Sequence, residues 1–69
     1  MLRVEYEARK QGKTQTAIGE HCGVTASLIS RVMRGAEKPY PKLQHGIASA
    51  LEWPTDRAAE LFEEITEVR

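Results

Sequence analysis

The 69-residue sequence has few of the residues that cross-link or anchor small proteins. It contains a single cysteine, Cys22, which excludes an internal disulfide and favours a reducing compartment. No apolar run approaches the length that crosses a bilayer, and the N-terminus lacks the apolar stretch of a signal peptide. We therefore expect a cytoplasmic protein that does not enter a membrane.

The patterns of catalytic and metal sites are also missing. There is no glycine-rich phosphate loop, no pair of acids placed for a cleft and no Ser/His/Asp arrangement. His21 and Cys22 are neighbours on a predicted helix, so their side chains diverge and cannot share a metal, and His45 has no partner ligand. We expect no enzyme, no metal site and no cofactor.

Strand signals are nearly absent, whereas helix start and stop signals are frequent. Thr14 and Thr25 are predicted N-caps, Gly23 is a predicted left-handed C-terminal residue, and Pro41 suits the first position of a helix. The sequence predicts one all-α domain over 1–69 with about five short helices, at 2–10, 15–22, 26–34, 41–51 and 55–68.

The predicted last helix is acidic and carries an apolar stripe made of Ala58, Leu61, Phe62, Ile65 and Val68. In one interpretation the stripe folds back on Ile47 and Leu51, with Trp53 as a core residue beneath it. In the other, it pairs with its copy across a twofold axis. The sequence leaves both open.

The net charge is zero, but its distribution is uneven. Residues 1–45 hold eight lysines and arginines against four acids, and residues 46–69 hold two against six. A phosphate backbone would be attracted by the first region and repelled by the second.

Two short helices joined through Gly23, Val24 and Thr25 predict a helix-turn-helix over 14–35. Gly23 allows a positive φ at the turn, and Gly19 lets the two helices approach closely. In this arrangement the first helix holds the second at a fixed angle to the major groove of DNA.

The second helix of the pair separates into two faces. Leu28, Ile29, Val32 and Met33 lie on one side, and Ser27, Ser30, Arg31 and Arg34 lie on the other with Ala26 beside them. A face of hydroxyls and arginines without an acid suits DNA, and Arg31 is placed to donate two hydrogen bonds to guanine.

The segment TQTAIGEHCGVTASLISRVMRG, residues 14–35, resembles the helix-turn-helix signature of the Cro/C1-type (XRE) family. The stretch from Lys38 to Leu51 continues the likeness and is similar to Ner-type regulators of Mu-like phages. The resemblance implies a lambda-repressor-like bundle and a small phage or prophage regulator. Gly19, Met33 and Lys13 depart from residues common in that family, and Lys13 replaces a residue that is frequently apolar before the cap.

The resemblance places a phosphate-binding glutamine at Gln15, base-reading positions at Ala26, Ser27, Ser30 and Arg31, and a backbone contact at Arg34. Thr25, the cap of the helix at 26–34, and Lys38 complete the expected DNA-binding set. For Lys38, a merely solubilising role is an equal alternative.

These observations predict a sequence-specific regulator of transcription that binds double-stranded DNA, acts as a repressor and binds its operator as a homodimer. The alternative is a protein-interaction module or antitoxin-like component that uses the same fold, which the zero net charge and the acidic C-terminal region favour.

Overall fold

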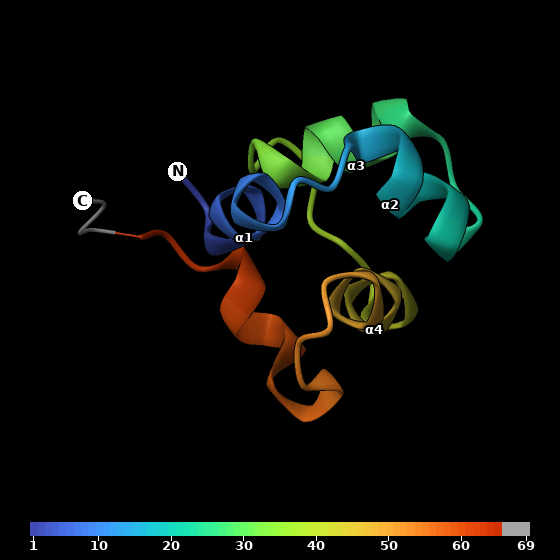
Figure 1. Cartoon of the computed structure of the whole chain (residues 1–69). Helices are drawn as coiled ribbons and strands as arrows, with labels where there is room; N and C mark the ends of the chain where they lie inside the picture. Colours follow the sequence, from blue (N-terminus) through green and yellow to red (C-terminus); the bar gives the residue numbers. More distant parts are fainter. Residues whose placement is uncertain (66–69) are drawn as a thin grey trace.

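The computed structural model describes residues 1–65 and shows four short α-helices followed by one 3₁₀ helix (Figure 1). Their bounds are α1 Arg3–Gln11, α2 Gln15–Cys22, α3 Ala26–Met33, α4 Pro41–Ala50 and η1 Thr55–Phe62. The prediction of an all-α chain of five short helices is confirmed, with boundaries that move by one residue in α1, α3 and α4. No helix within residues 1–65 is long and apolar enough to span a membrane.

Local sequence signals set the geometry of α2 and α3. The hydroxyl oxygen of Thr14 accepts a hydrogen bond from the Ala17 amide at 3.0 Å, and that of Thr25 accepts one from the Leu28 amide at 3.2 Å. Both caps satisfy amides that a helix start leaves without partners. Gly23 ends α2 with φ +74, a conformation that costs glycine little.

Gly19 permits the close contact between α2 and the turn that leads into α3. A Cβ atom built on Gly19 would lie 2.8 Å from the backbone oxygen of Val24, closer than real Cβ atoms come to such an atom. The absence of a side chain therefore sets how tightly the two helices pack, as the sequence predicted.

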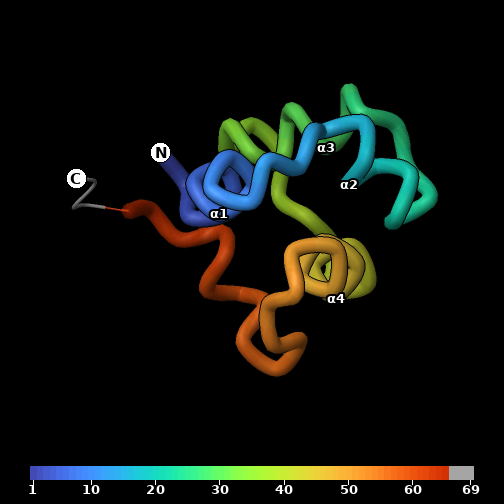
Figure 2. Tube along the Cα trace, in the orientation of Figure 1, coloured from blue at the N-terminus to red at the C-terminus, as the bar shows by residue number. Residues whose placement is uncertain are grey.

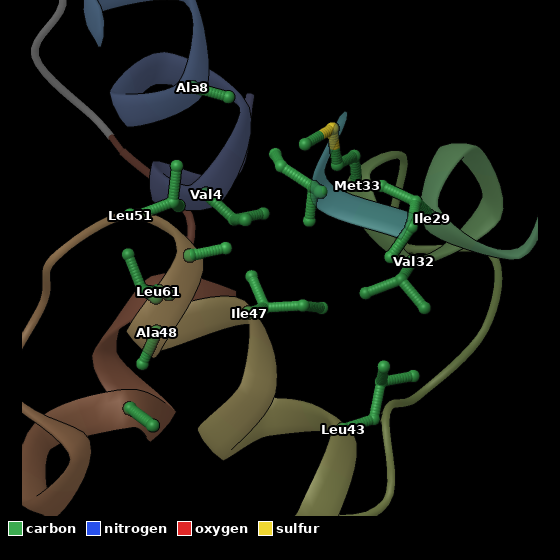
Figure 3. Close-up of a cluster of buried hydrophobic side chains, with 13 residues drawn as sticks. Val4, Ala8, Ile29, Val32, Met33, Leu43, Ile47, Ala48, Leu51 and Leu61 are labelled. Carbon is green, nitrogen blue, oxygen red and sulfur yellow. The ribbon is translucent and has the colours of Figure 1, made fainter. Parts of the chain in front are cut away.

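The core lies between α1, the α2–α3 pair, α4 and η1 (Figures 1 and 3). Its fully buried aliphatic side chains come from all five elements: Val4, Ile18, Ile29, Val32, Ile47, Leu51 and Leu61. Half-buried Cys22, Val24 and Trp53 pack against this cluster. Of the two interpretations of the last apolar stripe, the structure shows the first for Ala58 and Leu61, which are buried in the chain's own core.

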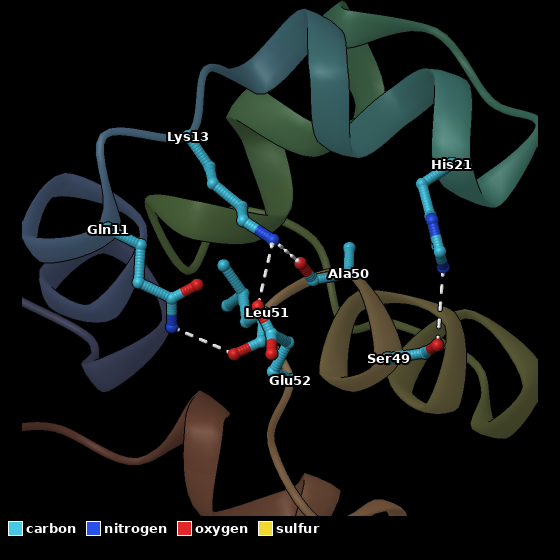
Figure 4. A network of polar contacts seen from close by, with 7 residues as sticks. All are labelled: Gln11, Lys13, His21, Ser49, Ala50, Leu51 and Glu52. Carbon is cyan, nitrogen blue, oxygen red and sulfur yellow. Dashed lines mark hydrogen bonds and ion pairs between the residues drawn. The ribbon is translucent and has the colours of Figure 1, made fainter.

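The end of α4 is fastened to the link between α1 and α2 (Figure 4). The side-chain Nε2 of Gln11 donates to the Leu51 carbonyl at 2.8 Å, and the Lys13 ammonium donates to the Ala50 carbonyl. A cation and a donor at a helix C-terminus satisfy carbonyls that have no partner within the helix. These bonds join the end of α4 to the end of α1 and to the segment that leads into α2.

The prediction of a regular helix over 55–68 is wrong. The last helix is a 3₁₀ helix that ends at Phe62, lacks a side-chain cap and contains Arg57 with a non-helical φ of −116. Residues 63–65 are extended and lie beside the start of α1 (Figure 2). There Leu2 and Glu64 form an antiparallel bridge, and the Ile65 amide donates to the Met1 carbonyl at 2.9 Å. Val68 lies outside the described residues.

Residues 63–65 are extended rather than helical because they pair with the N-terminal segment. The Arg3 amide at the start of α1 donates to the Glu63 carbonyl at 3.0 Å, so a backbone group that a helix start leaves free finds its partner in the C-terminal segment. Periodicity reports only local preference, and here a contact across nearly the whole chain decides the conformation.

Candidate nucleic-acid interface

Helix α3 presents one face to solvent and buries the other. Ile29, Val32 and Met33 are 0%, 1% and 3% exposed, whereas Ser27, Arg31 and Arg34 are exposed. The helix contains no acid, and Thr25 caps its N-terminus. The predicted separation of the two faces is therefore present, apart from Ala26 and Ser30, which are half-buried.

Arg31 is the centre of the exposed face and is held by two neighbours. Its Nη1 donates to the Ser27 hydroxyl oxygen at 3.2 Å, one helical turn earlier. Its Nε donates to Oε1 of Glu37 at 3.0 Å, in an ion pair whose side chains are 46% and 47% exposed. The structure thus brings together Ser27 and Arg31, two of the expected base-reading residues.

A second set of expected residues lines a groove between α1, the start of α2 and the end of α3. Gln15, Ser30 and Arg34 share this groove of about 390 Å³ with Arg9 and Lys13. The side-chain Nε2 of Gln15 lies 3.9 Å from the sulfur of Met33, a weak donor–acceptor contact. Arg34 makes no ion pair with any of residues 1–65, so its charge is available for an anion.

The remaining expected residues are less clearly placed for DNA. The Thr25 hydroxyl oxygen is used as the α3 cap but retains its own proton for donation. Lys38 is exposed and lines a different groove, together with Leu2, Val32 and Phe62. The structure does not bring Lys38 into the groove that holds Gln15 and Arg34.

Sequence reasoning missed three charged residues near this surface. Arg9 and Lys13 reach the groove because α1 ends beside α2, and Glu37 reaches Arg31 because the chain turns back after α3. Arg9 is also paired with Glu5 at 2.7 Å. The four-residue spacing of Glu5 and Arg9 could have signalled their pairing, but no sequence signal identifies the contact of Glu37 with Arg31.

Cys22 and the two histidines form no reactive or metal-binding site among the described residues. Burial raises the pKa of the Cys22 thiol above its ordinary value, which keeps the sulfur protonated and weakly nucleophilic. His21 contacts the Ser49 hydroxyl at 3.2 Å across α2 and α4 (Figure 4). Within residues 1–65 no group of three potential ligands is placed to hold a metal ion.

Comparison with known proteins gives two matches. A family profile described as a helix-turn-helix domain matches residues 2–61. The solution structure of the DNA-binding domain of the P22 C2 repressor superposes with a TM-score of 0.76 at 24% identity, covering 84% of this chain and 76% of that chain. No curated protein matches. The structural likeness confirms the predicted lambda-repressor-like fold.

Proposed function

The chain belongs to the helix-turn-helix domain family, and we propose that it is a sequence-specific regulator that binds double-stranded DNA. The observation that carries this proposal is the exposed face of α3, where Ser27 and Arg31 lie opposite a side that buries Ile29, Val32 and Met33 in the core. A rigid eight-residue helix of this kind fits the major groove, which is about 12 Å wide.

Arg31 is the base reader in this proposal. A guanidinium offers two parallel N–H donors that match O6 and N7 of guanine, and such a pair contributes about 1–3 kcal/mol of discrimination against other bases. Ser27, one turn nearer the start of α3, is small enough for the helix to approach the base edges. Ala26 offers a methyl group for apolar contact with a thymine methyl.

Phosphate contacts orient the helix in the groove. Gln15 stands at the first position of α2, where exposed amides and the helix dipole favour an anion. Arg34 stands at the end of α3 and shares the groove with Gln15, so the two side chains can contact the DNA backbone on one side of the reading helix. Phosphate contacts carry no base preference, so they orient α3 rather than choose the site.

We further propose a repressor that binds as a homodimer to a pseudo-palindromic operator. Helix-turn-helix proteins gain affinity by placing two reading helices in half-sites one DNA turn apart. Repression, rather than activation, is proposed because the matched domain belongs to a repressor, the P22 C2 repressor. The likeness of the stretch from Lys38 to Leu51 to Ner-type phage regulators makes a phage or prophage origin part of the same proposal.

Selection of bound duplexes from a random library, followed by titration of the enriched sequence and of a random duplex, tests the function. We expect an enriched site with two related halves, bound about 10³-fold or more tightly than random duplex. Weak binding to every duplex at low salt would leave only a non-specific DNA binder. No binding at low salt, together with co-purification of a partner protein, would favour the interaction-module alternative.

A further inference from the structure

Glu37 lies where an acid is unexpected, next to the exposed face of α3 that carries no acid of its own. The chain reaches this place through a tight turn. Gly35 adopts φ +76, and the Ala36 amide donates to the Arg31 carbonyl at 2.9 Å. The turn carries residue 37 back along α3 instead of away from it, so the contact with Arg31 follows from the backbone path.

The ion pair selects which edge of the Arg31 guanidinium remains free. Nε is engaged by Glu37 at 3.0 Å, and Nη1 donates to Ser27 at 3.2 Å. The edge formed by Nε and Nη2 is therefore occupied at Nε, whereas Nη2 donates to none of residues 1–65. One N–H of Nη1 is used by Ser27, so the second N–H of Nη1 and both N–H groups of Nη2 are left to donate to an acceptor beyond the helix.

We propose that Glu37 is a positioning residue for base recognition, which holds Arg31 so that its Nη1/Nη2 end faces the DNA. This inference rests on the proposed function and adds a specificity-determining residue to it. Arginine has several rotatable bonds, and ordering it before DNA arrives lowers the entropy lost when it binds a base. Ser27 fixes the guanidinium from the helix side and Glu37 from the turn side.

The same carboxylate also acts against non-specific binding. A negative charge beside the DNA-facing surface repels phosphates and neutralises part of the Arg31 charge, which weakens contacts that any sequence can make. A correct base compensates for this cost through the oriented Arg31, and a wrong base does not. The repulsion lowers specific and non-specific affinity together, so the higher ratio of specific to non-specific affinity comes from the orientation of Arg31.

The test compares Glu37→Ala and Glu37→Gln with Glu20→Ala, which removes an exposed acid of α2 that pairs with no residue in 1–65. For Glu37→Ala we expect tighter binding to random duplex and a specificity ratio about fivefold lower, near the upper limit of an exposed ion pair. Glu37→Gln keeps the acceptor oxygen for Nε and should recover part of the ratio. Glu20→Ala should leave the ratio unchanged.

Repeating the Glu37 changes in an Arg31→Ala background shows whether Glu37 acts through Arg31. We expect them to leave the specificity ratio of that variant unchanged, since the group to be oriented is gone. If Glu37→Ala tightens specific and random binding equally, Glu37 is only a surface charge and the inference is overturned. Failure of the proposed function looks different, because the unaltered protein then selects no sequence at all.

Discussion

The α2–α3 motif and the C-terminal region reach their structures in different ways. In the motif, each boundary follows from residues within it: Thr14 and Thr25 cap the two helices and Gly23 turns the chain. In the C-terminal region, η1 has no side-chain cap, Arg57 breaks its regularity, and residues 63–65 pair with the start of the chain. The first region is specified locally and the second by contacts distant in sequence.

The two regions also differ in charge and in what they offer to a partner. The motif exposes Arg31 and Arg34, whereas η1 and the residues after it expose Asp56, Glu63 and Glu64. In the C-terminal region the Arg57 guanidinium is neutralised by Glu60 at 2.9 Å, a pairing that holds the pKa of Glu60 below its ordinary value. The motif therefore exposes the cations that are proposed to meet DNA, whereas the C-terminal region completes the core.

The largest effect is expected from removing the main contact of the C-terminal region with the core. Leu61 is 0% exposed, and Leu61→Ala should lower the free energy of unfolding by about 2–5 kcal/mol through lost burial and a cavity. Thermal or urea unfolding measures this loss, with Ala59→Ser, an exposed change in the same helix, as the control. Equal stability of the two variants would show that η1 is not part of the core.

The next largest effect is on DNA affinity, which is compared after removing one arginine from each region. Arg31→Ala should weaken binding to the selected duplex by about 1–3 kcal/mol and relax the preference at one base pair. Arg57→Ala removes the same charge from the acidic region, where the guanidinium lies 5.7 Å over the Trp53 ring, and should leave DNA affinity nearly unchanged. Mobility-shift titration measures both. Similar losses for the two variants would contradict the division of roles.

A smaller effect tests the close packing within the motif. In Gly19→Ala the new methyl group meets the Val24 backbone oxygen, and overpacking of about 1–3 kcal/mol should exceed the helix-propensity gain of about 1 kcal/mol. In the matched change Gly46→Ala the nearest atom is the Cys22 sulfur at 3.1 Å, on a side chain that can move. Urea unfolding should rank Gly19→Ala as the less stable variant, and the reverse order would refute this account of the motif.

The same division explains how much the sequence could predict. The bounds of α2 and the two faces of α3 are correct because caps, turn glycine and helical periodicity all lie within 14–35. The extension of the last helix to 68 is wrong because its apolar stripe carries no information about the backbone pairing of Leu2 with Glu64. The helix predicted from the apolar periodicity ends at Phe62, because the residues that follow pair with the start of the chain instead.

In the candidate site, too, the features set within one helix were predicted and those set by distant contacts were not. Ser27 and Arg31 are exposed and in contact, as their spacing of four on one helix requires. Glu37 and the groove that gathers Arg9, Lys13 and Arg34 could not be predicted, because they depend on a turn and on the position of α1 beside α2. DNA contact by each of these residues stays a prediction.

The most direct test of the central claim is an NMR titration of the isotope-labelled protein with the selected duplex. If α3 reads the DNA, the amide shifts will concentrate along α3 and at the start of α2, from Gln15, and η1 will change little. Shifts that gather on η1 and α4 while Ser27 and Arg31 remain unperturbed would contradict the claim.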